Sequence, residues 1–383
     1  RIEASYSGSI NAEGEDGNNY LYINGSQKSI IKGGAGDDDI YTNETSKADL
    51  RGGIGDDYIQ STIYQGYWIN NSKGDLNNNY ILDETTNHKL NGGGGDDTLK
   101  VSGSYTRLEY GNNEVEVIGG AGNDTVDITD NNAGSTSNTN GNEYGIASVK
   151  INGGDGKDEI TVSGGLDVSI TTGADSDTVV LTAQQFRTLK EGARIIKNDD
   201  GSSNIVDAKP IYITDFSAGT TGDILDYGDL LRNGTLAYDG SNPFATGFLS
   251  LEQSGDDTLI RFDQDGSASN EKSAVIVAVL KNVTASELIA DNFNPNFPPD
   301  GSAASPKTID GTYLSDTLVG GFGDDTIRGL EGNDNIDGQA GSDKIYGGEG
   351  NDVIEGNFGN DELYGDSGND TITDDSGSNI LDG

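Results

Sequence analysis

The sequence contains no cysteine, so no disulfide bond can order its 383 residues. Hydrophobic residues make up only 32% of the chain, and it has no run of about 18 apolar residues that would predict a membrane span. So few apolar groups argue against a single large core. Folding of this chain therefore needs another source of stability.

Positively charged side chains are scarce as well. The chain has 23 Lys and Arg residues against 65 Asp and Glu residues, which gives a formal net charge of -42 at pH 7. This charge excludes a general affinity for nucleic acid, which proteins bind through Lys and Arg. It would normally indicate disorder, because little apolar burial is available to offset a chain entropy of about 1–2 kcal/mol per residue. Bound cations are the best remaining candidate for what orders the chain.

Side chains for catalysis are also few. His88 is the only histidine, and no cysteine or serine motif accompanies it, so a nucleophilic triad has little to build on. A polysaccharide-cleaving β-helix would need basic residues beside acidic ones on one strand face, and the sequence offers too few. We therefore predict a protein that is not an enzyme.

Glycine, in contrast, is abundant, and it marks a strict nine-residue repeat in the last fifth of the chain. The best copies read GGFGDDTIR and GGEGNDVIE, and the eighth residue is always Leu or Ile, which predicts one inward side chain per unit. The units begin at Gly311, Gly320, Gly329, Gly338, Gly347, Gly356, Gly365 and Asp374. Their sixth residues are Asp316, Asp325, Asp334, Asp343, Asp352, Asp361, Asp370 and Asn379.

The same motif recurs at irregular spacing in the first half of the chain. It begins at Gly33, Gly52, Gly92, Gly119 and Gly153, with a degenerate copy at Thr172, and its sixth residues are Asp38, Asp57, Asp97, Asp124, Asp158 and Asp177. Several starts lie 19 residues apart, so each copy can mark one full rung with a longer return turn, and larger gaps indicate inserted loops. Short alternating segments at 29–32, 116–118 and 150–152 predict strands that lead into the turns.

The residue types in this repeat favour calcium. Glycine permits positive φ, so several carbonyl oxygens can face the point that the sixth-position carboxylate reaches. Such oxygens suit Ca²⁺, whereas Mg²⁺ needs a tighter octahedron and Zn²⁺ prefers His or Cys. Aspartates on strands stacked ~4.8 Å apart would repel by about 3.5 kcal/mol per neighbouring pair at an effective dielectric of ~20. A divalent cation between turns replaces this repulsion with attraction, so folding and calcium binding become one event.

These motifs resemble the RTX (repeats-in-toxin) family of hemolysin-type calcium-binding repeats, closely over 311–383 and loosely over 33–180. The resemblance implies a right-handed parallel β-roll with two units per rung and Ca²⁺ held between stacked turns by the sixth-position aspartates and turn carbonyls. Turns at Gly320, Gly338 and Gly356 would then stack on one edge, and those at Gly311, Gly329, Gly347 and Gly365 on the other. The departures from the pattern are Leu314 and Asn379, which suggest caps, and Lys157 and Asp175 in the first array.

The predicted fold is mainly all-β, with parallel β-roll or β-helix arrays flanking a small mixed, mostly β domain. We expect an irregular roll with long insertions at 1–180, the mixed domain with short helices at 181–293, a proline-rich linker at 294–308 and the regular nonapeptide roll at 309–383. In the mixed domain, Thr182 with Gln185 and Thr284 with Glu287 form capping-box patterns that predict helices. Strands are expected at 211–216, 258–262 and 274–280.

Three other segments carry weaker hypotheses. Asp75, Asn77, Asn79 and Asp83 have spacings similar to a helix–loop calcium site, but Tyr80 occupies its glycine position, which favours an Asn-rich insertion. Asp263, Asp265, Ser267 and Glu271 fit either an oxygen-rich loop or a hairpin turn. Tyr64, Tyr67 and Trp68 could stack on a sugar ring or anchor a long loop.

The RTX resemblance implies export by a type I system, and thus an extracellular or cell-surface location. Arg1 is not an initiator methionine and the end at Gly383 looks like the opening of another repeat, so we expect a region of a larger protein. The favoured function is a calcium-rigidified scaffold of the surface-layer or adhesin type, whose partners would be calcium and either other copies of itself or cell-surface polysaccharide. The alternative is an accessory or secretion region of an exported RTX enzyme or toxin, since the segment IYITDFSAGTTGDILDYGDLL is similar to the region near the secretion end of such proteins.

Overall fold

The computed structural model describes residues 1–43, 45, 47–65, 87–105, 114–130, 146, 148–191, 194–197, 203–235, 238, 240–266, 274–302, 306–374 and 377–383. The chain forms two compact units. The first contains Arg1–Ser217, Thr221–Asp223 and Val277–Val283, and the second contains Ala218–Thr220, Ile224–Ile276 and Thr284–Gly383. In the described part of the chain, no helix has the length and apolar character needed to cross a bilayer.

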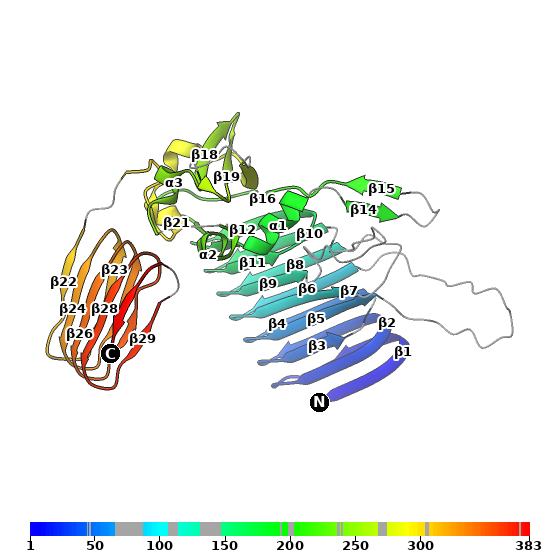
Figure 1. Ribbon diagram of the computed structural model, residues 1–383. Helices are drawn as coiled ribbons and strands as arrows, with labels where there is room; N and C mark the ends of the chain where they lie inside the picture. The colour runs from blue at the N-terminus through cyan, green and yellow to red at the C-terminus, as the bar shows by residue number, and fades with distance from the viewer. Residues whose placement is uncertain are drawn as a thin grey trace. The chain divides into compact units, whose positions relative to one another are not determined.

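A parallel β-roll fills the first unit, and its strands stack in chain order (Figure 1). One face consists of β1 (Ile2–Glu13), β2 (Tyr20–Ala35), β4 (Lys47–Ile54), β6 (Asn87–Gly94), β8 (Glu114–Ala121), β10 (Ser148–Asp155), β12 (Asp167–Ala174), β16 (Ile211–Ile213) and β20 (Val275–Leu280). The other face begins with the N-terminal part of β2 and continues with β3 (Asp39–Asn43), β5 (Tyr58–Gln65), β7 (Thr98–Tyr105), β9 (Thr125–Asp130), β11 (Glu159–Ser163) and β13 (Thr178–Leu181). The predicted parallel roll is thus confirmed.

The register confirms that each glycine-rich copy marks one rung. Asp38 and Asp57 occupy equivalent places 19 residues apart, whereas the following intervals are 40, 27 and 34 residues. The strands stay in register across the longer intervals, because Tyr58 pairs directly with Thr98 and Thr98 with Thr125. All the extra residues therefore enter at the edge opposite the glycine-rich turns, where β5 leads to β6, β7 to β8 and β9 to β10.

The core of this roll follows the two-residue period of its strands. Two side chains per strand point inward, as Ile160 and Val162 do on β11 and Val149 and Ile151 do on β10, each at most 3% exposed. A short polar line interrupts the aliphatic core. Thr42 Oγ1 and Ser61 Oγ lie 2.8 Å apart, and Ser61 Oγ lies 2.7 Å from Nδ1 of the fully buried His88. The only histidine of the sequence is therefore a core residue.

Helix α1 (Ala183–Glu191) begins where its capping box predicts. Oγ1 of Thr182 accepts a hydrogen bond from the backbone N–H of Gln185 at 3.1 Å. The Gln185 side chain does not return this bond, because its Oε1 accepts from Gly164 N–H and its Nε2 donates to Gly165 O. After the helix, β14 (Arg194–Lys197) and β15 (Ser203–Val206) form an antiparallel pair.

The expected strands of the mixed segment are present: β16 is shorter than predicted, and β19 (Asp257–Phe262) and β20 closely match the prediction. The remaining elements are β17 (Ile224–Asp226), α2 (Gly228–Gly234), α3 (Pro243–Thr246), β18 (Leu249–Ser254), η2 (Ala285–Glu287), η3 (Ala290–Asn292) and β21 (Phe293–Asn294). The short helix predicted at Thr284 forms only as the single 3₁₀ turn η2, without the side-chain cap that the pattern predicts, and Leu288 is extended. The buried Asn292 side chain bonds to the N–H and C=O of Gly219, which holds this segment in place without helix propagation.

The C-terminal nonapeptides form a second, thinner parallel roll. One face contains β22 (Thr308–Asp310), β24 (Thr326–Glu331), β26 (Lys344–Glu349), β28 (Glu362–Ser367) and β30 (Ile380–Asp382), and the other contains β23 (Thr317–Phe322), β25 (Asn335–Ala340), β27 (Val353–Glu355) and β29 (Thr371–Thr373). The predicted inward residues Ile327, Ile336, Ile345, Ile354 and Leu363 are fully buried. Leu381, also predicted to point inward, is 50% exposed because the described chain has no further rung to cover it.

Candidate metal centres

The turns of the first roll depend on glycine at positions where neighbouring backbones meet. Gly53 and Gly55 have φ of 133° and 128°, in the left-handed region that favours glycine. A Cβ on Gly53 would overlap the carbonyl oxygen of Gly34 in the preceding turn, and one on Gly55 would lie 2.6 Å from the carbonyl oxygen of Gly36. The carbonyl oxygens of the second and fourth turn residues therefore face the following turn.

The sixth-position aspartates form a continuous ladder along this edge. Oδ1 of each aspartate accepts the backbone N–H of the residue at the same position in the preceding turn, for example 2.8 Å from Asp38 N to Asp57 Oδ1. The ladder runs through Asn19, Asp38, Asp57, Asp97, Asp124, Asp158 and Asp177. Each of these aspartates is at most 2% exposed. One carboxylate oxygen thus fixes the spacing of successive turns.

The second carboxylate oxygen is the candidate metal ligand. Oδ2 of Asp38, Asp57, Asp97, Asp124, Asp158 and Asp177 is buried and has no hydrogen-bond partner among the described residues. A Cβ on Gly52 would overlap Oδ2 of Asp57 and lie 2.6 Å from the carbonyl oxygen of Gly92 in the next turn. A carboxylate oxygen and a carbonyl oxygen therefore converge on one small space. Two acceptors without a donor are costly in a buried place, and a cation between them removes that cost.

Residues 14–19 form a turn that the sequence prediction missed. Asn19 occupies the sixth position, and its Nδ2 donates to the carbonyl oxygens of Glu15 and Gly17 at 2.6 and 2.5 Å. The amide nitrogen thus binds the carbonyls of the second and fourth turn residues. In the equivalent turns with aspartate, a carboxylate oxygen stands where Asn19 has its amide nitrogen, so no donor lies between the turn carbonyls. The signal was available, because Gly14, Gly17 and Asn19 stand 19 residues before Gly33, Gly36 and Asp38.

The second roll repeats this arrangement on two edges, with a spacing of 18 residues. One ladder contains Lys307, Asp325, Asp343, Asp361 and Asn379, and the other contains Asp316, Asp334, Asp352 and Asp370. This is the division of turns that the RTX resemblance implied. Oδ2 of Asp325, Asp334, Asp343, Asp352, Asp361 and Asp370 is again buried without a hydrogen-bond partner in the described part of the chain.

Asp316 differs from the other predicted ligands. Its Oδ2 accepts hydrogen bonds from the N–H and Oγ1 of Thr312, at 2.6 and 2.9 Å. The carboxylate is therefore satisfied within its own turn, the one in which Leu314 replaces a glycine. This turn fits the cap that its sequence predicts better than a full metal site.

The fifth turn residues form a second ladder, which the sequence prediction also missed. The side-chain oxygen of Asp56 accepts the N–H of Asp96 in the following turn at 2.9 Å, and Asp96 accepts that of Asn123 at 2.7 Å. This ladder points in the direction opposite to that of the sixth-position ladder. It requires Asp, Asn or Ser at the fifth position. The backbone N–H of Lys157 donates such a bond to Asn123 Oδ1, but the Lys157 side chain cannot accept the next one.

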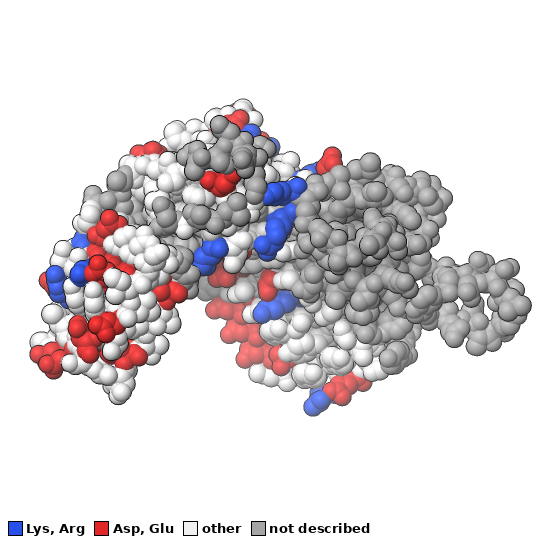
Figure 2. Space-filling view, viewed as in Figure 1, with Lys and Arg blue, Asp and Glu red and all other residues white. Residues whose placement is uncertain are grey.

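The electrostatics of the ladder favour a bound cation. Burial, opposed by the backbone N–H bond and reinforced by neighbouring aspartates, raises the pKa of Asp97 to about 7 and that of Asp343 to about 8. The same causes raise the pKa of Asp57, Asp124 and Asp158 to about 6 and that of Asp177 and Asp361 to about 7. Figure 2 shows acidic side chains gathered along the turn-bearing edge of the first roll. The carboxylates thus resist ionisation until an opposite charge is near.

Two carboxylates outside the repeats close the end of the first ladder. Oδ1 of Asp223 accepts the N–H of Asp177 at 3.1 Å, and its Oδ2 accepts the N–H of Ser217 at 2.8 Å. Asp215 accepts the N–H of Thr172 at 2.8 Å. These residues lack the glycine pattern, so no motif predicts that they continue the ladder.

The chemistry of these places fits calcium and not zinc. In the part of the chain that the structure describes, no three Asp, Glu or His side chains form a metal-binding group. Each place instead combines a carboxylate with backbone carbonyls, which is an all-oxygen set of the kind that Ca²⁺ accepts. Three other predictions lie wholly or partly outside the described residues: the site at Asp75, Asn77, Asn79 and Asp83, the cluster containing Tyr67 and Trp68, and the loop containing Ser267 and Glu271.

Comparison with known protein families identifies a calcium-binding repeat in this chain. The family profile of the RTX calcium-binding nonapeptide repeat matches residues 25–44, 116–127, 310–345, 337–372 and 355–383. These segments cover the turns at Gly33 and Gly119 and the whole C-terminal array. No curated protein matches the chain.

Proposed function

Because this chain carries the calcium-binding nonapeptide repeats of the RTX family, we propose that both rolls hold Ca²⁺ between successive turns and complete their folding when it binds. RTX repeats form structural calcium-binding regions, typical of secreted proteins, and they are not catalytic units. The observation that carries the proposal is the buried Oδ2 without a hydrogen-bond partner among the described residues, which recurs at the sixth position of successive turns in both rolls. A single such oxygen would be a local defect, but a regular column of them points to a common ligand.

The proposed ligands are one carboxylate oxygen per turn and the carbonyl oxygens that face it. The carboxylates are those of Asp38, Asp57, Asp97, Asp124, Asp158 and Asp177 in the first roll and Asp325, Asp334, Asp343, Asp352, Asp361 and Asp370 in the second. Asp316 is a weaker candidate, because Thr312 already satisfies its Oδ2. Calcium would supply the charge that the ladder lacks and so link folding to its concentration.

We further propose that this region is an extracellular scaffold of the surface-layer or adhesin type and not an enzyme. Two long parallel rolls suit a spacer or lattice element, and the single histidine is buried in a core. With a net charge of -42, the chain would meet either a cationic surface or another acidic surface bridged by calcium. Other copies of this chain and cell-surface polysaccharide are the two partner classes consistent with that charge.

Circular dichroism and isothermal titration of the full chain test calcium binding. The β-sheet signal should be weak in chelator and rise cooperatively with Ca²⁺, with dissociation constants of about 10⁻⁴–10⁻³ M, the range of extracellular calcium modules. Mg²⁺ at the same concentration should give a much smaller change. A full β-sheet signal in chelator, or equal responses to both ions, would contradict the proposal.

Analytical ultracentrifugation tests the scaffold role. Calcium-dependent sedimentation as oligomers, or co-sedimentation with purified cell-surface polysaccharide, is expected for a lattice or adhesive element. A chain that stays monomeric in saturating calcium and ignores the polysaccharide would favour the alternative, an accessory or secretion region of an exported enzyme or toxin. The specific feature behind this alternative is the segment with Asp215 and Asp223, which is similar to the secretion end of such proteins and closes the first ladder.

A further inference from the structure

The last described turn of the second roll departs from the repeat at two positions. It begins with Asp374 where the other turns on this edge have Gly320, Gly338 and Gly356, and its sixth residue is Asn379, not aspartate. A carboxylate is therefore lost at the sixth position and gained at the first. Both changes concern the interval between this turn and the one that begins at Gly356.

The geometry shows what the gained carboxylate replaces. At an ordinary interval, a Cβ on Gly338 would lie 2.6 Å from Asp343 Oδ2 and 3.0 Å from the carbonyl oxygen of Gly356. At the last interval, a Cβ on Gly356 would lie 2.7 Å from Asp361 Oδ2 and 2.7 Å from Asp374 Oδ2. A carboxylate oxygen thus stands where the preceding interval has a carbonyl oxygen.

Asp361 is aimed into this place and needs a counter-charge. It is 1% exposed, its Oδ1 accepts the N–H of Asp343 at 2.7 Å, and its Oδ2 has no hydrogen-bond partner within the described residues. Two carboxylate oxygens that face one another in a buried place repel strongly unless a proton or a cation lies between them.

We propose that Asp361 and Asp374 together bind one calcium ion, and that this two-carboxylate site binds calcium more tightly than the one-carboxylate sites of the same roll. The inference rests on the proposed calcium function and adds to it a ligand that the nonapeptide pattern does not contain. A larger ligand charge raises affinity for Ca²⁺. The site would therefore fill first, at the end of the roll where no further turn is described.

Calcium titration of the full chain, with Asp374→Asn and Asp374→Gly, tests this inference. The first change removes the charge at nearly constant shape, and the second restores the ordinary turn residue. In both variants one ion per chain should move from the tightest class of sites to the weaker class, with its affinity lowered by about tenfold. Circular dichroism in saturating calcium checks that both variants keep the wild-type fold.

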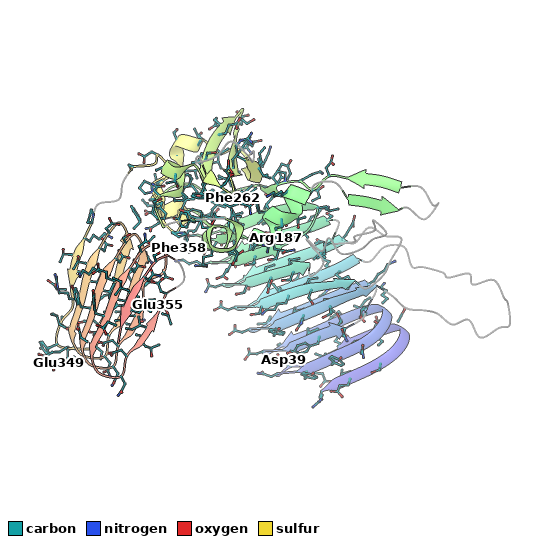
Figure 3. The ribbon with its side chains drawn as sticks, in the orientation of Figure 1. Asp39, Arg187, Phe262, Glu349, Glu355 and Phe358 are labelled. Carbon is teal, nitrogen blue, oxygen red and sulfur yellow. The ribbon has the colours of Figure 1, made fainter. Side chains whose placement is uncertain are left out.

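Glu355→Gln is the matched control. Glu355 is exposed and lies on β27 directly before Gly356 (Figure 3). Its replacement by glutamine removes one negative charge, as the Asp374 substitutions do. Its titration should equal that of the wild type. If the Asp374 variants titrate like Glu355→Gln while the wild type binds calcium, the inference is wrong and the proposed function stands. If the wild type binds no calcium, the proposed function itself fails.

Discussion

At the scale of single residues, the two oxygens of each ladder aspartate have separate tasks. Oδ1 of Asp57 holds the backbone of the preceding turn, whereas Oδ2 faces other oxygens and is available for a cation. Asn19 shows the effect of removing the charge. An NH₂ group stands where the aspartates have Oδ2, and it donates hydrogen bonds to two carbonyl oxygens of the turn. These carbonyls are therefore satisfied without a metal ion. Aspartate and asparagine at this position therefore specify two kinds of turn.

Asn19→Asp should create a calcium site. The substitution replaces the amide donor with a second oxygen acceptor beside the carbonyls of Glu15 and Gly17, which gives this turn the oxygen set of the other ladder turns. Isothermal titration should show one additional calcium ion per chain. Asn18→Asp, which adds the same charge at the neighbouring exposed position, should not change the stoichiometry, and an equal gain in both variants would show that charge alone attracts the ion.

Asp343→Ala should damage the second roll far more than Asp366→Gly. The alanine leaves the buried N–H of Asp325 without its acceptor, which costs about 1–3 kcal/mol, and removes a proposed calcium ligand. Asp366 is the second residue of its turn and has a φ of 66°, so glycine should relieve roughly 1 kcal/mol of strain. Calcium midpoints and melting temperatures of the two variants measure this difference. Equal shifts in the calcium midpoint would mean that the turn register is wrong.

At the scale of strands and turns, the two rolls differ in how much they bury. Each strand of the first roll places two side chains in the core, as Ile160 and Val162 do, whereas each strand of the second places one, as Ile345 does. At about 1.5–3 kcal/mol per buried aliphatic side chain, a rung gains about 6–12 kcal/mol in the first roll and about 3–6 kcal/mol in the second. The second roll should therefore depend more than the first on the proposed calcium ions.

Hydrogen exchange should reveal this difference. In chelator, amides of the second roll, such as those of β26, should exchange nearly as fast as in an unfolded chain, while amides of β10 and β11 keep measurable protection. In saturating calcium both sets should be protected. Mass spectrometry of the intact chain with and without chelator makes the comparison. Equal protection of both rolls in chelator would show that burial does not set their calcium dependence.

The same elements show how far the sequence could predict the structure. The strict spacing of glycine and aspartate was enough to predict which turns share an edge of the second roll. It also predicted the inward residues and the ladder aspartates. The turn at 14–19 was missed because Glu15 and Asn19 replace the expected Gly and Asp, and the role of Asp223 was missed because it joins the ladder from outside any repeat. The helix predicted at Thr284 stops after one 3₁₀ turn, and the contact of Asn292 with Gly219 that follows it is long-range, so no local pattern predicts it. Local motifs were sufficient wherever the repeat itself supplies the long-range contacts.

At the scale of the whole molecule, the charge of -42 makes the calcium-free chain sensitive to pH. Burial raises the pKa of three ladder carboxylates from 3.8, to about 6 in Asp57, about 7 in Asp97 and about 8 in Asp343. Raised pKa values mean that protonation favours the folded calcium-free state. This stabilisation is fully present below pH 3.8 and is lost as the pH rises through about 6 to 8.

Acidification should therefore increase folding in calcium-free buffer. The β-sheet signal in circular dichroism should rise as the pH falls from 8 to 5, because protons neutralise the ladder in place of calcium. The calcium concentration at the midpoint of folding should increase as the pH falls from 8 to 5, because protons and calcium compete for the same carboxylate oxygens. A signal that falls on acidification would show that the carboxylates are not buried together in the calcium-free chain.

The one-sided placement of the inserted residues in the first roll has an evolutionary consequence. Intervals of 19, 40, 27 and 34 residues all end in the same register, so an insertion at the edge opposite the turns leaves the ladder unchanged. Mutations that lengthen these connections escape the selection that preserves the turns. Descendants can then diverge in length until the period disappears from the sequence while it persists in space. The family profile recognises residues 25–44 and 116–127 as separate segments, whereas the backbone places both in one stack without a break in register.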